Sequence, residues 1–134
     1  MKHIATLIAP LRVYFPRVRV EDKHFILNLN NYRNAHLFTL NDSKIKYKEV
    51  MAEQIAKLPA LTKVAVRFTL FPKTHRRTDT PNVCAVHDKY FMDAMVEFGK
   101  LPDDSFNHYV ETGYRFGEVD KYNPRVEIEI FEAK

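Results

Sequence analysis

The sequence is poor in cysteine, glycine and tryptophan: its 134 residues include one cysteine, three glycines and no tryptophan. The single cysteine, Cys84, cannot form a disulfide within the chain. This excludes a disulfide-stapled secreted domain and favours a reducing cytoplasm. No glycine-rich linker, internal repeat or low-complexity segment divides the chain. We therefore expect one domain over residues 1–134, long enough to bury a core of its own.

Long hydrophobic runs are also missing, and none approaches the roughly 18 to 20 apolar residues that a membrane-spanning helix needs. The N-terminal stretch MKHIATLIAPLRVYF is apolar, but it lacks a small-residue cleavage site and charged residues soon follow it. It therefore predicts a strand rather than a signal peptide. We expect a soluble, cytoplasmic protein with no membrane partner.

Charge is present in mild excess, with 21 basic against 17 acidic residues and a net charge of +4. The placement of the basic residues is more informative than their number. Five of them and one histidine lie within fifteen residues, just before an acidic segment begins: Lys63, Arg67, Lys73, Arg76 and Arg77, with His75. A cluster of basic side chains attracts a polyanion such as nucleic acid, and neighbouring acidic side chains can bind a divalent cation.

The first half of the chain predicts strands followed by a helix. Residues 3–15 predict one or two strands interrupted by Pro10, and residues 23–30 predict another strand that ends in an Asn-Asn turn. Residues 30–42 predict a polar loop or a short extended piece. The apolar spacing over residues 44–58 predicts a helix capped within 41–43 and ended by Pro59.

The second half predicts a strand, a helix and two further strands. Residues 63–71 alternate clearly, and Thr80-Pro81 predicts the N-cap and first residue of a helix that ends near Gly99. Residues 109–116 and 126–131 predict two strands joined by a turn-rich segment. Because strands outnumber helices and do not alternate strictly with them, we expect an α+β (mixed α/β) fold, with two main helices packed on a small mixed sheet.

The predicted second helix separates into two faces at ~100° per residue. Its apolar face packs on the core and includes His87, which is therefore expected to be a core histidine rather than a ligand. The opposite stripe carries Asn82, Lys89, Asp93 and Glu97, while Asp79 precedes the helix and the Asp103-Asp104 pair follows it.

These acidic and basic side chains have two readings. A Mg²⁺ ion held by carboxylates can activate water against a phosphodiester, and a lysine can stabilise the charge that develops. In the second interpretation these residues have no functional role. Lys89 and Asp93 form a surface ion pair four residues apart, and the other aspartates are ordinary turn and helix-entry residues.

The same segment resembles the signature of the RusA family of Holliday-junction resolvases, which are phage and prophage endonucleases. That family carries a basic run, Asp-x-Asp-Asn, a helix with Lys-x-x-x-Asp-Ala, and then Asp-Asp. The matching stretches are Arg76-Arg77-Thr78-Asp79, Asn82, Lys89 to Ala94, and Asp103-Asp104. The stretch HFILNLNNYR is similar to the family's first strand and Asn-Asn loop, and PRVEIEI to the end of its last hairpin. The resemblance covers roughly residues 23–132 and leaves 1–22 as an N-terminal extension.

The resemblance implies a crossover junction endodeoxyribonuclease that uses Mg²⁺, with Mn²⁺ as the alternative ion. Its catalytic residues would be Asp79, Lys89 and Asp104, with Asp79, Asp103 and Asp104 on the metal and Asn82 and Asp93 in support. The implied DNA-binding residues are Asn31, Arg33, Lys73, Arg76 and Arg77. The partner would be a four-way DNA junction cut by a homodimer, in the cytoplasm of a bacterial host if the protein is phage-encoded.

Two departures from the family pattern leave an alternative open. The family's second aspartate falls on Pro81, which cannot bind a metal, and the interval from Asp79 to Lys89 is longer by about one helical turn. Asp88 lies ~140° from Asp93 around the helix and is not expected to replace the lost carboxylate. The alternative is a catalytically inactive RusA-like module that binds DNA or a protein. A nuclease for flaps or gapped DNA is a third reading.

Overall fold

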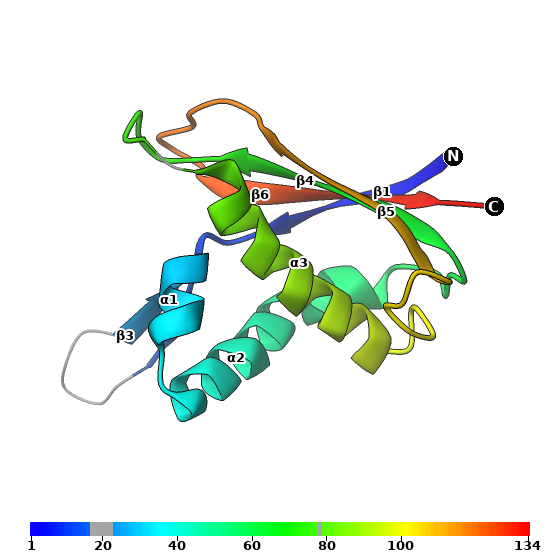
Figure 1. Cartoon of the computed structure of the whole chain (residues 1–134), viewed down its shortest axis with the longest axis horizontal. Coiled ribbons are helices and arrows are strands. Elements are labelled where there is room, and N and C mark those ends of the chain that lie inside the picture. Colours follow the sequence, from blue (N-terminus) through cyan, green and yellow to red (C-terminus); the bar gives the residue numbers. More distant parts are fainter. Residues whose placement is uncertain (17–22, 78) are drawn as a thin grey trace.

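The fold is α+β, as the sequence predicts, with helices on one face of a mixed sheet (Figure 1). We analyse a computed structural model, which describes residues 1–16, 23–77 and 79–134. The helices and strands in chain order are β1 (Lys2–Ala9), β2 (Arg12–Phe15), β3 (Lys23–Ile26), α1 (Leu29–Asn34), α2 (Leu37–Ala56), β4 (Val64–Phe71), α3 (Thr80–Glu97), β5 (Tyr109–Phe116) and β6 (Arg125–Glu132). No helix in the described ranges is long and apolar enough to cross a membrane.

The main sheet has four strands in the order β1-β6-β4-β5. β6 pairs antiparallel with both β1 and β4, while β5 runs parallel to β4 at the opposite edge from β1. The expected hairpin of the last two strands is therefore wrong, because β4 lies between them. Its alternating sequence buries Val64, Val66, Phe68 and Leu70, which makes it suitable for a central position.

The predicted strand over residues 23–30 is too long, and the polar loop predicted after it is wrong, because two helices occupy this part of the chain. The strand ends at Ile26, and α1 begins once the Asn28 side chain accepts a hydrogen bond from the Asn31 backbone N–H, at 2.8 Å. α2 begins at Leu37, where the His36 ring accepts from the Phe38 N–H at 3.2 Å. The expected caps at 41–43 therefore lie inside the helix.

The second long helix matches its prediction within a residue. The N-cap of α3 is Asp79 rather than the predicted Thr80, which is instead the first helical residue, with Pro81 in the first turn. The helix ends at Glu97, shortly before Gly99, whose φ is +74°. Such a φ suits glycine, which has no Cβ to clash. The tight turn at this end sends the chain back along the helix toward Asp104.

The core lies between the sheet and the three helices. Phe68 of β4 meets Phe91 of α3 edge to face, and Tyr90 of α3 meets Tyr47 of α2 in the same way. The buried Tyr90 hydroxyl is 2.7 Å from the Ser43 hydroxyl, so this polar pair in the core is satisfied. These contacts fix α3 against both the sheet and α2.

The predicted N-terminal extension, residues 1–22, contributes to both sheets. β1 is an edge strand of the main sheet, and β2 pairs with β3 in a separate two-stranded ribbon; residues 17–22 lie outside the described ranges. On the outer side of β1, the Gln54 side chain accepts from the Ile8 N–H and donates to the Ile8 carbonyl, each at 2.8 Å. Gln54 thereby closes part of that edge and ties it to α2.

Replacing Gln54 by Ala is expected to lower the free energy of unfolding by about 1 kcal/mol, because two backbone groups lose their partners while water can still reach them. Urea unfolding followed by circular dichroism measures the change. Glu53→Ala, one residue earlier on the exposed side of α2, is the control. An equal loss in both variants would mean that the edge contact does not set the cost.

Candidate active site

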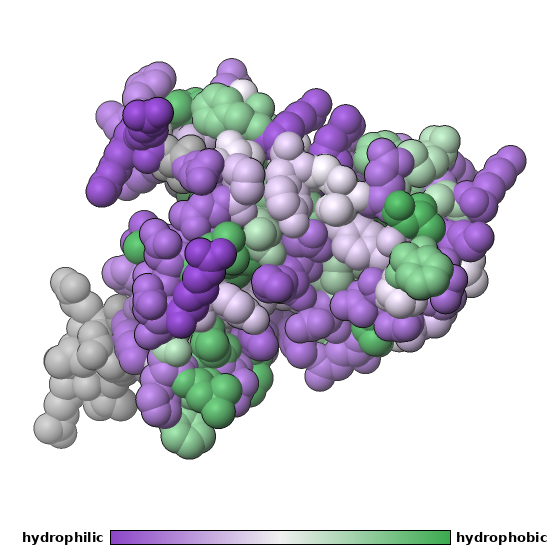
Figure 2. Space-filling view, in the orientation of Figure 1, coloured by the Kyte–Doolittle hydropathy of each residue, from purple (hydrophilic) through white to green (hydrophobic). Residues whose placement is uncertain are grey.

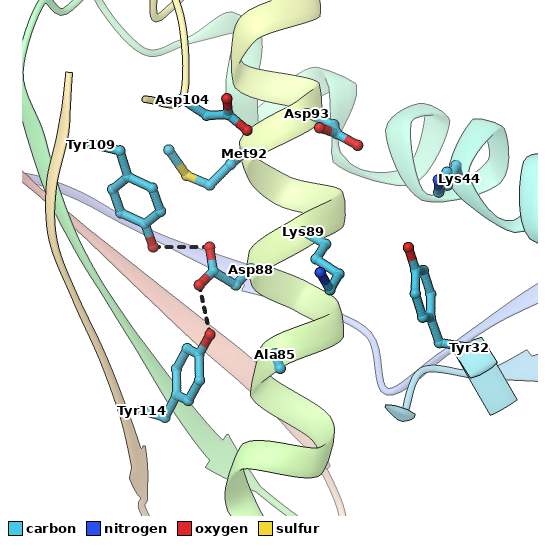
Figure 3. A pocket seen from close by; sticks show the side chains of 10 residues that line it. All are labelled: Tyr32, Lys44, Ala85, Asp88, Lys89, Met92, Asp93, Asp104, Tyr109 and Tyr114. Carbon is cyan, nitrogen blue, oxygen red and sulfur yellow. Dashed lines mark hydrogen bonds between the residues drawn. The ribbon is translucent and has the colours of Figure 1, made fainter. Parts of the chain in front are cut away.

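A hollow of about 440 Å³ lies along the outer side of α3, and we call it the α3 hollow (Figure 3). α3 forms its floor, β5 supplies one wall, and α1 and α2 supply the other. Asp104 enters it from the loop after α3. The lining residues are Tyr32, Lys44, Ala85, Asp88, Lys89, Met92, Asp93, Asp104, Tyr109 and Tyr114.

Asp88 is held on the β5 side of the α3 hollow. Its two carboxylate oxygens accept hydrogen bonds from the hydroxyls of Tyr109, at 2.9 Å, and Tyr114, at 2.7 Å (Figure 3), and Thr112 approaches at 3.5 Å. Burial raises the pKa of both tyrosines, and the neighbouring carboxylate raises it further, so both remain protonated donors at neutral pH. Asp88 therefore has a fixed orientation, and most of its acceptor positions are used.

Two lysines, one on α2 and one on α3, lie near the Tyr32 ring of α1 (Figure 3). Lys89 Nζ lies 5.7 Å from the ring centre and Lys44 Nζ lies 5.9 Å from it. Cations over an aromatic face at this range gain some electrostatic stabilisation. The arrangement places two positive charges on the same hollow as three aspartates, which suits a ligand carrying both phosphate oxygens and a bound cation.

Asp93 and Asp104 are exposed carboxylates on the same hollow. Asp104 follows Asp103, whose side chain accepts from the Asp104 backbone N–H at 2.7 Å. Hydrogen bonds from Ser105 and from that N–H lower the pKa of Asp103. Asp103 thus shapes the loop, while Asp104 is the member of the pair that lines the hollow.

A second hollow, of about 570 Å³, lies at the N-terminal end of α3, and we call it the basic hollow. Lys73, Arg76 and Arg77 line it from the β4–α3 loop, together with Arg12 of β2 and Asp79. Figure 2 shows it as a notch on the left of the molecule with hydrophilic side chains on its walls. Three of the predicted DNA-binding residues are therefore gathered on one surface.

The structure brings together only part of the predicted catalytic set. Lys89, Asp93 and Asp104 share the α3 hollow, whereas Asp79 lines the basic hollow at the start of the helix. Asn82 also lines the basic hollow, and its side chain accepts from the Leu29 N–H at 3.2 Å, which ties α3 to α1. In the part of the chain that the structure describes, no group of three or more His, Cys, Asp or Glu is arranged to hold a metal.

The two remaining predicted DNA-binding residues lie on α1. Asn31 bonds within its own segment: its N–H donates to Asn28, and its side-chain amide donates to the Ile26 carbonyl at 3.0 Å. It therefore stabilises the turn from β3 into α1. Arg33 is exposed in the last turn of α1.

Several residues of the α3 hollow were not anticipated from the sequence. The helical angle of Asp88 predicts a place away from Asp93, yet both line the same hollow because the hollow spans the whole outer side of α3 (Figure 3). Lys44 and the two β5 tyrosines carried no local signal, since their roles depend on elements distant in sequence. His87 is a fully buried core residue, as expected, with Nδ1 3.3 Å from the Tyr47 hydroxyl.

Comparison with protein-family models and with curated proteins finds no match to this chain. The similarity to the RusA family therefore rests on the sequence resemblance alone.

Proposed function

We propose that the protein is a divalent-metal-dependent endonuclease for branched DNA, of the kind that resolves Holliday junctions by paired phosphodiester hydrolysis. The observation that supports it best is the meeting of Lys89 and Asp104 on one hollow, with Asp93 beside them. These residues come from the helix and from the loop after it. In this proposal the α3 hollow is the site of cleavage and the basic hollow binds the DNA backbone.

The donor set of the α3 hollow fits Mg²⁺. This ion takes oxygen ligands and is commonly held by one or two carboxylates, with water and substrate oxygens completing its shell. Asp93 and Asp104 would supply those carboxylates, and Mn²⁺ would accept the same donors. When bound, the ion would neutralise phosphate charge and lower the pKa of a coordinated water.

The other residues of the hollow act around that position. Lys89 and Lys44 offer positive charge to the phosphate, and Lys89 is the group proposed to stabilise the developing negative charge. Asp88 is fixed by three hydroxyl groups, so it orients the β5 wall rather than binding an ion. Lys73, Arg76 and Arg77 would hold the backbone approaching from the other end of α3, reading shape rather than base sequence.

A second function has its own supporting observation. Asp79 lies outside the α3 hollow and Pro81 stands where the family has a further aspartate. A RusA-like module that binds DNA or a protein without cutting would require neither carboxylate. This reading keeps the basic hollow as a phosphate-binding surface and gives the α3 hollow no reaction.

A cleavage assay separates the two functions. Wild-type protein with a synthetic four-way junction and Mg²⁺ is expected to produce symmetric paired nicks, with little cutting of linear duplex and none in EDTA. Lys89→Met is expected to reduce nicking at least about 10²-fold, the scale for losing one transition-state charge stabiliser.

Binding measured in parallel keeps the outcomes distinct. Lys44→Met, near the same Tyr32 ring, removes an equal charge and is expected to weaken binding more than it slows cutting. Tight junction binding without nicks under Mg²⁺ or Mn²⁺ would reject the nuclease and favour the binding module. Cutting restricted to flaps or gaps would retain the chemistry and change the substrate.

A further inference from the structure

Among the strands of the described ranges, β5 ends the main sheet and has β4 on one side only. Its residues Val110 to Phe116 are exposed, among them three large apolar or aromatic side chains: Val110 at 45%, Tyr114 at 36% and Phe116 at 54%. An edge strand with free backbone groups and exposed apolar residues pairs readily with another strand. The opposite edge of the sheet differs, because Gln54 occupies both backbone groups of Ile8 there.

The sequence of β5 is complementary to itself when it runs antiparallel. With Gly113 opposite Gly113 of a second copy, Glu111 comes opposite Arg115, Thr112 opposite Tyr114, and Val110 opposite Phe116. The last three pairs each occur twice by symmetry. Opposite charges and aromatic or β-branched side chains placed across a strand pair stabilise the pairing.

The backbone phase of β5 agrees with this register. The Gly117 N–H donates to the Leu70 carbonyl of β4 at 2.8 Å, so by alternation the backbone groups of Thr112, Tyr114 and Phe116 point to the free edge. In the register about Gly113, Thr112 and Tyr114 form a hydrogen-bonded pair. Glu111 and Arg115 then form the closer, non-hydrogen-bonded type of pair, in which side chains approach well.

The Glu111 and Arg115 side chains, which carry the charge complementarity, are exposed to solvent. The Arg115 side chain is 55% exposed; its Nε donates to Thr69 at 3.1 Å, and its terminal nitrogen is 3.7 Å from Glu129. Glu111 is exposed on the same face of the sheet, since it aligns with Ala65 as Arg115 aligns with Thr69. This face is opposite the one that the helices cover.

We infer that the free edge of β5 is the dimer interface, where a second copy of this chain pairs antiparallel about a two-fold axis at Gly113. Two four-stranded sheets then join into one, and both sets of helices lie on the same face. Thr112, which approaches Asp88, pairs with Tyr114 of the second copy, so the two α3 hollows meet at the axis. This assigns a surface to the two-fold dimer of the proposed function, and it can be tested without any activity.

A charge-exchange experiment tests this register. Glu111→Lys alone and Arg115→Glu alone each place two like-charged pairs in the homodimer, and each is expected to raise the dimer dissociation constant about tenfold or more. An equimolar mixture of the two variants has opposite charges at both positions. Sedimentation velocity should therefore show a dimer in the mixture and in the wild type, at concentrations where each variant alone is monomeric.

Circular dichroism confirms that each variant is folded, and a cysteine variant gives a second measurement if Arg115→Glu is not. Gly113→Cys places two thiols at the axis at a separation that a disulfide can bridge, so oxidation should give a covalent dimer. Glu118→Cys, beyond the strand, should not. A wild type that is monomeric throughout, or a dimer that is indifferent to both charge changes and gives no disulfide through Gly113→Cys, would overturn the interface.

Discussion

Replacing Asp104 by Asn is expected to reduce junction cleavage at least about 10²-fold, while Asp79→Asn leaves most of the activity. Both substitutions remove one negative charge and preserve side-chain shape. They differ in place: Asp104 lines the α3 hollow with Lys89, and Asp79 lines the basic hollow at the start of the helix. Initial nicking rates on a four-way junction at saturating Mg²⁺ measure the difference.

The reason for the asymmetry is the short distance at which a carboxylate must lie from the metal that it binds. A bound Mg²⁺ requires its protein oxygens about 2 Å away, so carboxylates on separate hollows cannot ligate one ion without a large rearrangement. Asp79 instead precedes the first turn of α3, where its negative charge stabilises the helix through the helix dipole. Because asparagine is an equally good N-cap residue, Asp79→Asn should keep its fold.

The opposite pattern would carry its own meaning. If Asp79→Asn abolishes nicking and Asp104→Asn does not, the reaction takes place in the basic hollow and the α3 hollow has another role. If neither variant changes a cleavage rate that depends on metal, other groups hold the ion. Thermal stability measured with and without Mg²⁺ checks the same assignment, because an ion bound to the folded state raises the melting temperature.

The strands were largely predictable because their signal is local. Alternating apolar residues over 64–71 and 126–131 already determine which side chains reach the core. The pairing of the strands could not be predicted from local sequence. A turn-rich segment before Pro124 favours a hairpin of β5 and β6, yet each of these strands pairs with β4. That β4 lies between them depends on how the whole sheet assembles.

The starts of α1 and α2 were missed for a different reason. Asn28 sits at the end of an apolar run that predicts strand, and His36 is an uncommon capping residue, so neither marks a helix start on its own. In each case the side chain satisfies one of the first backbone N–H groups of the helix. The capping contact can be recognised only when the path of the backbone around Asn28 and His36 is known.

The candidate site divides in the same way. The relation of Lys89 to Asp93 follows from helix period, and the resemblance adds Asp104. The α3 hollow is broad because β5 forms one wall and α1 and α2 form the other. Asp88 of α3, Lys44 of α2 and Tyr32 of α1 therefore line it together, although no spacing rule connects their positions. A helical wheel gives the directions of side chains around the helix, but it does not give the width of the hollow that neighbouring elements form over that helix.

The second large effect is expected on stability: lowering the pH from 7 to 5 should reduce the free energy of unfolding by about 2 kcal/mol through His87 alone. His87 is fully buried between α2 and α3, where burial lowers its pKa to about 3. Its Nε2 atom has no hydrogen-bond partner among the described residues. A proton placed there would therefore be an unpaired buried charge.

The sign follows from which state binds the proton first. The unfolded chain takes up a proton at this histidine near its ordinary pKa of about 6.5, while the folded protein does not until about pH 3. Between those values the unfolded state is favoured by about 1.4 kcal/mol for each unit that the pH falls. The stability is intact above pH 7 and declines steadily below it.

A double variant isolates this histidine from other acid effects. His87→Phe would leave the Tyr47 hydroxyl without its partner at 3.3 Å, so it is made together with Tyr47→Phe. The single variant Tyr47→Phe is the matched control, because it changes the same contact and keeps the histidine. Urea unfolding at pH 7, 6 and 5 should show the pH dependence in the wild type and the control, and largely abolish it in the double variant. Equal slopes in all three proteins would mean that the imidazole is protonated or reached by water in the folded state, in which case the packing between Tyr47 and α3 is more open than its burial indicates.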